Sequence, residues 1–248
     1  MNQINQNNYQ NKKNQKRNIT GILVCDKPIE WTSHDVVAKI RGNFKLNKIG
    51  HAGTLDPIAT GVLVLLSGKA TKLSNQLISD DKEYRFNILF GTSTDSQDIT
   101  GKIIEQDENP PERSAEEIEG VLKQFRGEIS QLPPMFSAVK INGKRLYKLG
   151  REGKTVEREP RNITIKKLVL EDVAWPRATI HAVCSKGTYI RTLCNDIGQK
   201  LATEGGCMET LVRLRSGDYS IDQSHKIEEI ISWTPEEFEN NLLPLPVV

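Results

Sequence analysis

The sequence lacks any long hydrophobic run. The apolar stretch at 62–66 spans about five residues, whereas a helix needs about 20 apolar residues to cross a bilayer. The chain also lacks the charged start, apolar middle and small-residue cleavage site of a secretory signal peptide. These absences predict a cytoplasmic protein that has no membrane among its partners.

Cysteine is scarce and has no metal-binding pattern. None of the four cysteines forms a Cys-x-x-Cys pair, and no histidine follows at a spacing typical of zinc sites. Glycine-rich nucleotide-binding loops are also missing. We therefore expect no metal and no cofactor. The cysteines are predicted to be reduced, mostly buried thiols, as is usual in the cytoplasm: Cys25, Cys184, Cys194 and Cys207.

Charge of one sign is not in excess overall. The 248 residues carry a net charge of +2, so global electrostatics indicate no particular partner. Residues 139–168 are different, because they contain ten Lys and Arg residues against three Glu. This local excess suits a surface that tracks phosphates, although a solvated face explains it equally well.

The pattern of elements predicts an α+β fold. Residues 1–18 are rich in Asn, Gln and Lys and are predicted to be a disordered tail. Strands and helices then follow without a regular βαβ repeat, which favours a mixed, largely antiparallel central sheet flanked by helices. Asn142-Gly143 predicts a hairpin turn. Strands are expected at 22–25, 62–66, 163–170, 179–184, 211–214 and 219–221, and at 84–90, where exposed and buried positions alternate. Helices are expected near 32–40, 70–79 and 189–202, from 224, and from Ser114, where Glu117 closes a capping box.

The loop at 50–61 is the most informative segment, because it places Asp56 between glycines and before Pro57. A proline suits the first position of a short helix, and an acid at a helix entrance is anionic and firmly aimed. An Asp that merely caps a turn is the simpler interpretation. The polar neighbours His51, Thr54 and Thr60 favour a catalytic one.

Two further positions have both a structural and a catalytic interpretation. Tyr84 in a strand is typical of a core residue, but it would also suit an aromatic plate for an extruded base, with a hydroxyl for proton transfer. Arg191 follows Gly187-Thr188 at an expected strand-to-helix entrance. It is either an exposed helix arginine or the partner of a buried carboxylate, whose charged form a guanidinium favours.

Six sequence blocks follow one another in order between about residues 22 and 219. They are Asp26-Lys27-Pro28 with Thr32-Ser33, the loop at 50–61, Lys82-x-Tyr84, Gly91-x-x-Thr94-Asp95-x-x-Asp98-x-x-Gly101, Pro133-Pro134-x-x-Ser137-Ala138-x-Lys140-x-x-Gly143, and the block at 184–192. Together, and at family-like spacing, these blocks resemble the TruB family of tRNA pseudouridine-55 synthases.

The resemblance implies a role for each matching residue. The family's nucleophile falls on Asp56, the base-displacing histidine on His51, and the arginine that pairs with the nucleophile on Arg191. Tyr84 would pack against the target uracil. The residues implied in substrate binding are His51, Tyr84, Tyr189, Leu211, Lys27 and Lys140.

The resemblance also implies a pseudouridine synthase fold over 19–223, with a basic hairpin or thumb insertion at about 130–162 and a helical extension at 224–248. The chain departs from the family in two ways: Glu30 replaces a usual glycine, and no room is left for a C-terminal PUA-type RNA-binding domain. We therefore expect the catalytic domain and the basic insertion to carry the tRNA contacts.

The implied activity is isomerisation of uridine-55 in the T loop of tRNA to pseudouridine, by a monomer and with no small-molecule cofactor. The target nucleotide must leave the stack for this reaction. Asp56 would attack either the uracil ring or the sugar. The alternatives are a non-catalytic tRNA chaperone, a guide-RNA-dependent pseudouridine synthase subunit and an Asp-nucleophile hydrolase. A hydrolase would need a second acid for general-acid catalysis, and this sequence has none at a recognisable spacing.

Overall fold

A computed structural model describes residues 16–137, 139–141, 143–201 and 203–246. The chain divides into two compact units: the terminal unit, residues 1–80 and 213–248, and the central unit, residues 81–212. Most of the predicted tail, residues 1–15, lies outside the described residues. Arg17 forms a bridge with Leu46, so ordered structure begins before residue 18.

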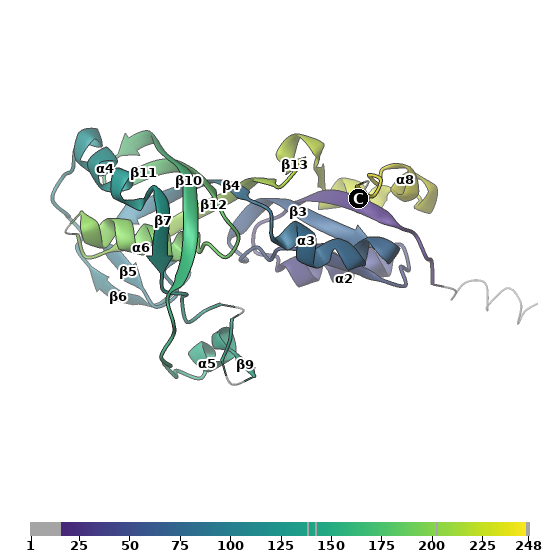
Figure 1. The fold of residues 1–248 in the computed structure, drawn as a ribbon, viewed down its shortest axis with the longest axis horizontal. Helices are drawn as coiled ribbons and strands as arrows, with labels where there is room; N and C mark the ends of the chain where they lie inside the picture. Colours follow the sequence, from purple (N-terminus) through teal and green to yellow (C-terminus); the bar gives the residue numbers. More distant parts are fainter. Residues whose placement is uncertain (1–15, 138, 142, 202, 247–248) are drawn as a thin grey trace, which may run out of the picture. The chain divides into compact units, whose positions relative to one another are not determined.

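The terminal unit combines a sheet with short helices (Figure 1). Its strand order is β14-β1-β3-β12, with β2 also pairing with β3 and β13 with β12. β1 is antiparallel to β3 and parallel to β14. The elements are β1 (Gly21–Lys27), α2 (Ser33–Asn43), β2 (Ile49–Ala52), β3 (Ala59–Ser67), η1 (Gly68–Leu73), α3 (Ser74–Ile78), β13 (Tyr219–Ser220), η3 (Ile221–Gln223), β14 (His225–Lys226), α7 (Ile227–Ser232) and α8 (Pro235–Asn240).

Strands β1 and β3 are apolar on both faces because both faces are covered. Side chains alternate across a strand, so Leu23 and Leu63 join one cluster of buried residues while Val24 and Val64 join another. Helix α2 contributes Val36, Val37 and Ile40 to the first cluster, and η1 and α3 contribute Ala70 and Leu77 to the second. The continuous apolar run at 62–66 is therefore a strand covered on both faces.

The C-terminal helices complete the core of the terminal unit. Ile227, Ile230 and Phe238 belong to the same buried cluster as β1 and α2. The ring of Phe238 stacks on that of Phe44 with centroids 4.1 Å apart. Residues from 224 onward are thus packed into this unit.

The central unit contains a sheet with the strand order β12-β4-β11-β10-β7. β11 pairs antiparallel with β4 and β10, and β10 pairs antiparallel with β7. The elements are β4 (Lys82–Phe90), β5 (Thr92–Thr94), β6 (Ile103–Gln106), α4 (Ala115–Leu122), η2 (Lys123–Phe125), β7 (Gly127–Gln131), β8 (Lys140–Ile141), β9 (Lys144–Arg145), α5 (Leu146–Arg151), β10 (Arg161–Ala174), β11 (Arg177–Cys184), α6 (Ile190–Lys200) and β12 (Gly206–Ser216).

The predicted α+β class with a largely antiparallel sheet is confirmed. Helix α4 begins with the expected capping box of Ser114 and Glu117. Strands β8 and β9 form the predicted hairpin, although Asn142 at its turn lies outside the described residues. The helix expected at 70–79 is divided into η1 and α3. Strands β2, β5, β6 and β7 were not predicted, because their short sequences show no apolar alternation.

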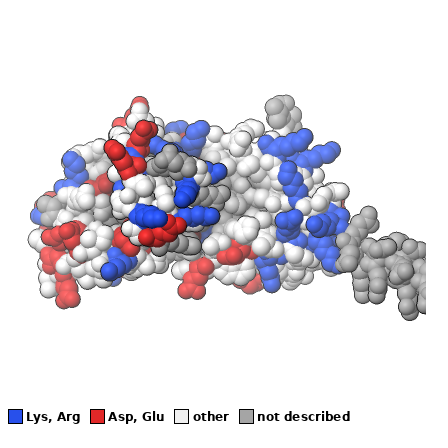
Figure 2. Space-filling view, turned by 90° about the horizontal axis from the view of Figure 1, so that it is seen from below, with Lys and Arg blue, Asp and Glu red and all other residues white. Residues whose placement is uncertain are grey.

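No helix among the described residues is long and apolar enough to cross a membrane. All four cysteines are buried free thiols. Lys and Arg side chains gather on the surface beside the point where the described chain begins (Figure 2).

The packing of the C-terminal helices gives the first prediction. Phe238→Ala should lower the free energy of unfolding by about 3–5 kcal/mol, because it opens a cavity in a closed core. Urea denaturation measures this. The control is Leu245→Ala at a side chain that is 38% exposed, which should change stability by no more than about 0.5 kcal/mol. A Phe238→Ala cost as small as the control's would contradict this description of the core.

Candidate active site

Asp56 lies in the short loop between β2 and β3. Its carbonyl accepts a hydrogen bond from the amide of Ala59 at 3.1 Å, which closes a four-residue turn. Pro57 occupies the second position of that turn, a place its fixed φ suits. Of the two local conformations open after Asp56, a helix entrance and a turn, the structure has the turn, because the backbone enters β3 at Ala59 and leaves no length for a helical turn. Asp56 itself is half-buried.

Buried side chains hold this loop on both sides of Asp56. The hydroxyl of Ser33 accepts a hydrogen bond from the amide of Leu55 at 2.9 Å. The guanidinium of Arg213 donates to the carbonyl of Gly53 at 3.2 Å and to that of Val62 at 2.7 Å. Ser33 and Arg213 are each 1% exposed. The loop is thus fixed before Asp56 by contacts with the interior.

Lys27 holds the loop just after Asp56. Its ammonium donates to the carbonyls of Pro28, Trp31 and Pro57 at 2.8, 2.6 and 3.2 Å. An ammonium has three donors, and each of them has a carbonyl acceptor here. Lys27 is fully buried, so its side chain positions the loop in this structure and presents no surface to a substrate.

Burial lowers the pKa of Lys27 to about 8, and the negative charge of Asp56 offsets part of that decrease. The charged form is the one that satisfies all three carbonyls, because deprotonation removes one donor. The network that holds the Asp56 loop therefore depends on a cation kept in the interior.

His51 lies on β2, opposite Leu65 of β3. Its Nδ1 is buried and has no hydrogen-bond partner among the described residues. Burial lowers the pKa of His51, and the positive charge of Arg213 lowers it further. A backbone hydrogen bond with Gly53 offsets part of this decrease in pKa.

Two backbone positions beside the loop have left-handed conformations. Gly61 has a φ of +93°, and a Cβ there would lie 2.3 Å from the carbonyl oxygen of Arg213. Glu30 has a φ of +68°, and its amide donates to the carbonyl of Pro57 at 2.8 Å. Glu30 thus adopts the conformation that a glycine adopts freely, at a cost of roughly 1–2 kcal/mol for an L-residue.

Arg191 lies in the first turn of α6 in the central unit and is 4% exposed. Its two terminal nitrogens donate to the carbonyls of Ser96 and Phe136, each at 2.8 Å. Its Nε lies 3.7 Å from Oδ2 of Asp98. The guanidinium is therefore held in one orientation by two carbonyls and a carboxylate.

Asp98 is itself firmly placed. It is 6% exposed. Its Oδ1 accepts from the hydroxyl of Ser96 at 2.9 Å and from the amide of Thr100 at 3.0 Å. These bonds leave Oδ2 for Arg191. Asp98 belongs to the sequence motif at 91–101, but the motif alone assigns it no role.

The other predicted residues of the central unit differ in accessibility. Tyr84 on β4 faces the core and is 9% exposed, and Leu211 on β12 is buried. Tyr189 directly precedes α6, and Gln131 fixes it by accepting from its amide at 2.8 Å and donating to its carbonyl at 3.1 Å. Lys140 on β8 is exposed.

The structure therefore brings the predicted residues together in two groups. Asp56, His51 and Lys27 share the terminal unit, and the remaining five belong to the central unit. The supporting residues Ser33, Arg213 and Gln131 were not predicted. The sequence pattern does indicate that Arg213 is buried, because residues two apart in a strand lie on the same face and Leu211 is apolar.

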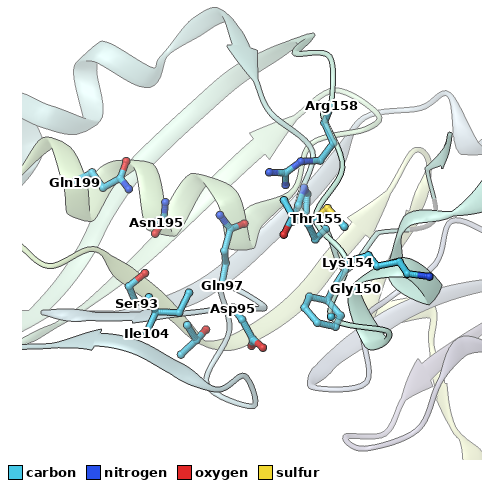
Figure 3. A pocket seen from close by; sticks show the side chains of 15 residues that line it. Ser93, Asp95, Gln97, Ile104, Gly150, Lys154, Thr155, Arg158, Asn195 and Gln199 are labelled. Atoms are coloured by element: carbon cyan, nitrogen blue, oxygen red, sulfur yellow. The ribbon is translucent and has the colours of Figure 1, made fainter.

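A pocket of about 460 Å³ opens in the central unit. Figure 3 shows Gln97 and Asp95 on one side, Asn195 and Gln199 projecting from α6, and Arg158 on the opposite side. Nε of Arg158 is buried and has no hydrogen-bond partner among the described residues. Phe136, which also lines the pocket, is a carbonyl partner of Arg191. The lining offers amides, a carboxylate and a guanidinium, but it contains none of the predicted site residues, so this pocket does not define the candidate active site.

Solved structures share this fold. A chain of a Cbf5–Nop10–Gar1 complex matches with a TM-score of 0.71 and 28% identity, over 90% of this chain and 60% of that chain. An H/ACA ribonucleoprotein bound to a substrate RNA containing 2′-deoxyuridine matches with a TM-score of 0.67 and 25% identity, over 90% of this chain and 59% of that chain. The chain thus spans about 60% of the length of these chains and has a pseudouridine synthase fold.

Sequence comparison identifies the family. The model of the TruB family pseudouridylate synthase N-terminal domain matches residues 41–190, and that of the tRNA pseudouridylate synthase B C-terminal domain matches residues 191–245. The chain belongs to the TruB family of pseudouridylate synthases.

Curated relatives match over most of this chain. The tRNA pseudouridine synthase B of Francisella tularensis subsp. tularensis (strain WY96-3418) is 45% identical over 218 residues, which are 88% of this chain and 72% of the relative. That of Alkaliphilus oremlandii (strain OhILAs) is 44% identical over 227 residues, which are 92% of this chain and 74% of the relative.

The buried ammonium gives a prediction about pH. Below pH 8 Lys27 is charged in both the folded and the unfolded protein, and the cost of burying the charge is fully present. Between a folded pKa of about 8 and the unfolded value of 10.5, only the unfolded chain holds the proton, so stability relative to Lys27→Met should rise with pH by about 1.4 kcal/mol per unit.

Urea denaturation of wild type and Lys27→Met from pH 7 to pH 10.5 measures this difference. Lys226→Met at an exposed lysine is the control and should run parallel to wild type. A difference between wild type and Lys27→Met that does not change with pH would mean that Lys27 is not a buried cation.

Proposed function

We propose that the chain isomerises uridine-55 in the T loop of tRNA to pseudouridine, with Asp56 as the nucleophile. The observation that carries the proposal is the Asp56 loop, where buried side chains hold the backbone on both sides of one half-buried carboxylate in a chain of the TruB family. The names of the relatives, tRNA pseudouridine synthase B, support tRNA as the substrate.

The reaction rearranges bonds within one nucleotide. The bond from C1′ of the ribose to N1 of uracil breaks, and a bond from C1′ to C5 forms. The proton on C5 is lost and N1 gains one, so atoms and electrons balance without an oxidant or a second substrate. Asp56 attacks either the ring or C1′, and its turn keeps the carboxylate aimed throughout.

The uridine must be extruded from the folded loop before the carboxylate can reach it. His51 would fill the space that the base leaves, and its buried Nδ1 has no hydrogen-bond partner among the described residues. Tyr84 would pack against the uracil, because aromatic rings stack on extruded bases. Tyr84 or a water molecule would take the proton from C5.

Arg191 would serve as the partner of the Asp56 carboxylate, and Asp98 would orient it. A guanidinium with three fixed contacts keeps its direction as charge moves during the reaction. Asp98 is thus a positioning residue that acts through Arg191.

The tRNA would bind through its T arm to exposed lysines of the basic insertion. These include Lys140, Lys144, Lys148 and Lys154. We also infer a monomer in the cytoplasm, where free thiols such as the four buried cysteines stay reduced.

Two other functions use the same surfaces. A tRNA chaperone would need the basic residues but not an anchored Asp56. A guide-RNA-dependent synthase subunit would share the catalytic residues, and the similarity to H/ACA ribonucleoprotein chains favours testing it. The purified chain with unmodified tRNA and no other RNA separates these possibilities.

Asp56→Asn should reduce the single-turnover rate of pseudouridine formation by at least about 10³-fold, as expected for loss of a nucleophile. Release of tritium from C5-labelled uridine in tRNA measures the rate, and tRNA binding should be retained. Asp222→Asn at an exposed acid is the control. Full turnover by Asp56→Asn would contradict the mechanism, and an inactive wild type that recovers with a guide RNA would favour the guide-dependent function.

Asp98→Asn should lower the single-turnover rate by about 10- to 100-fold, because Arg191 loses the carboxylate charge 3.7 Å from its Nε that helps to orient it. Affinity for tRNA should change little, because Asp98 is buried away from phosphates. The control is Asp172→Asn at an exposed acid. Equal losses of rate and affinity would show that Arg191 binds phosphate rather than acting in the reaction.

A further inference from the structure

Three separated segments of the terminal unit carry cations without any acid. Residues 16–20, 41–48 and 68–72 contain no Asp or Glu. They contain seven basic residues: Lys16, Arg17, Arg41, Lys45, Lys48, Lys69 and Lys72. The segments lie far apart in the sequence, so a search for runs of charge does not find them.

Backbone hydrogen bonds join these segments at one place. The amide of Arg17 donates to the carbonyl of Lys45 at 2.8 Å, and the amide of Gly68 donates to that of Lys48 at 2.9 Å. The amide of Lys69 donates to the hydroxyl of Thr20 at 3.2 Å. We name the result the basic corner and define it by five exposed residues: Arg17, Arg41, Lys45, Lys48 and Lys69.

The backbone under the basic corner is firmly held. Phe44 and Leu46, on either side of Lys45, are 2% and 1% exposed. Ser67 donates to the carbonyl of Ile19 at 2.7 Å beneath the surface. The cations therefore project from a fixed base, and Figure 2 shows Lys and Arg side chains gathered at this end of the chain.

The basic corner is distant from Asp56 along β3. This strand begins at Ala59, just after the Asp56 turn, and ends at Ser67, just before Gly68. The six steps from Gly61 to Ser67 span about 20 Å at ~3.3 Å per residue. The corner therefore cannot contact the nucleotide on which Asp56 would act.

We propose that the basic corner binds the phosphate backbone of the tRNA duplex that lies beyond the T arm. The proposal rests on the proposed function, in which tRNA is the substrate. An A-form RNA duplex carries two phosphates at every base pair, so a duplex running about 20 Å past the site offers on the order of ten phosphates. Five cations without an acid among their three segments complement such a backbone and need no particular base sequence.

The test compares two RNAs and two matched triple variants. Lys45→Gln, Lys48→Gln and Lys69→Gln together remove three charges from the corner. The control, Lys102→Gln, Lys123→Gln and Lys200→Gln together, removes three charges from exposed sites of the central unit. Binding of unmodified full-length tRNA and of the isolated T-arm stem-loop is measured as a function of salt, and urea denaturation establishes that both variants are folded.

The corner variant should bind full-length tRNA more weakly than wild type, with a salt slope lower by about 1 for each lysine removed. Its binding of the T-arm stem-loop should stay within about twofold of wild type, since non-contacting charges more than a Debye length away are largely screened. The control variant should bind both RNAs as wild type does.

Equal weakening on both RNAs would overturn the proposal, because the corner would then contact the T arm itself. An unchanged salt slope on full-length tRNA would also overturn it. Because binding is the readout, the result does not depend on turnover. A wild type that forms no pseudouridine but binds tRNA through the corner would refute the proposed function alone.

Discussion

The terminal unit depends on one buried cation. The ammonium of Lys27 is enclosed completely and shares its three protons among three carbonyls, one of them in the residue after Asp56. A buried charge is tolerated only where every donor is satisfied. The carbonyls of Pro28, Trp31 and Pro57 therefore must converge, and their convergence sets the path of the loop that carries Asp56. Arg213 imposes the same condition from the other side, through Gly53 and Val62.

Backbone strain and close packing near Lys27 also constrain the conformation of the Asp56 loop. Glu30 accepts a left-handed backbone while its amide binds Pro57, and Gly61 leaves no room for a side chain against Arg213. Such costs persist where the surroundings over-determine the conformation, which is typical of functional loops. The central unit uses a comparable arrangement, in which Asp98 and two carbonyls fix the guanidinium of Arg191. In both units a charged side chain is oriented by groups that sequence spacing alone does not connect.

Local sequence signals predicted much of the fold. The alternation from Tyr84 to Phe90, the capping box at Ser114 and the β8–β9 hairpin each depend on neighbours within a few residues, and each is found. The sequence left a helix entrance and a turn both open after Asp56, because the two begin alike when proline follows an acid. The turn forms because β3 pairs with β1, which lies about 35 residues earlier in the chain.

The sequence by itself determined the family, the α+β class and the identity of the candidate residues, because motif residues in order and at characteristic spacing require no coordinates. Only the tertiary structure decided what those residues do locally. It placed Lys27 in the interior, gave Arg191 its neighbour Asp98, and joined Arg17, Lys45 and Lys69 on one surface. The physical reason is that burial and charge proximity arise from contacts between distant segments, and chain folding alone brings these segments together.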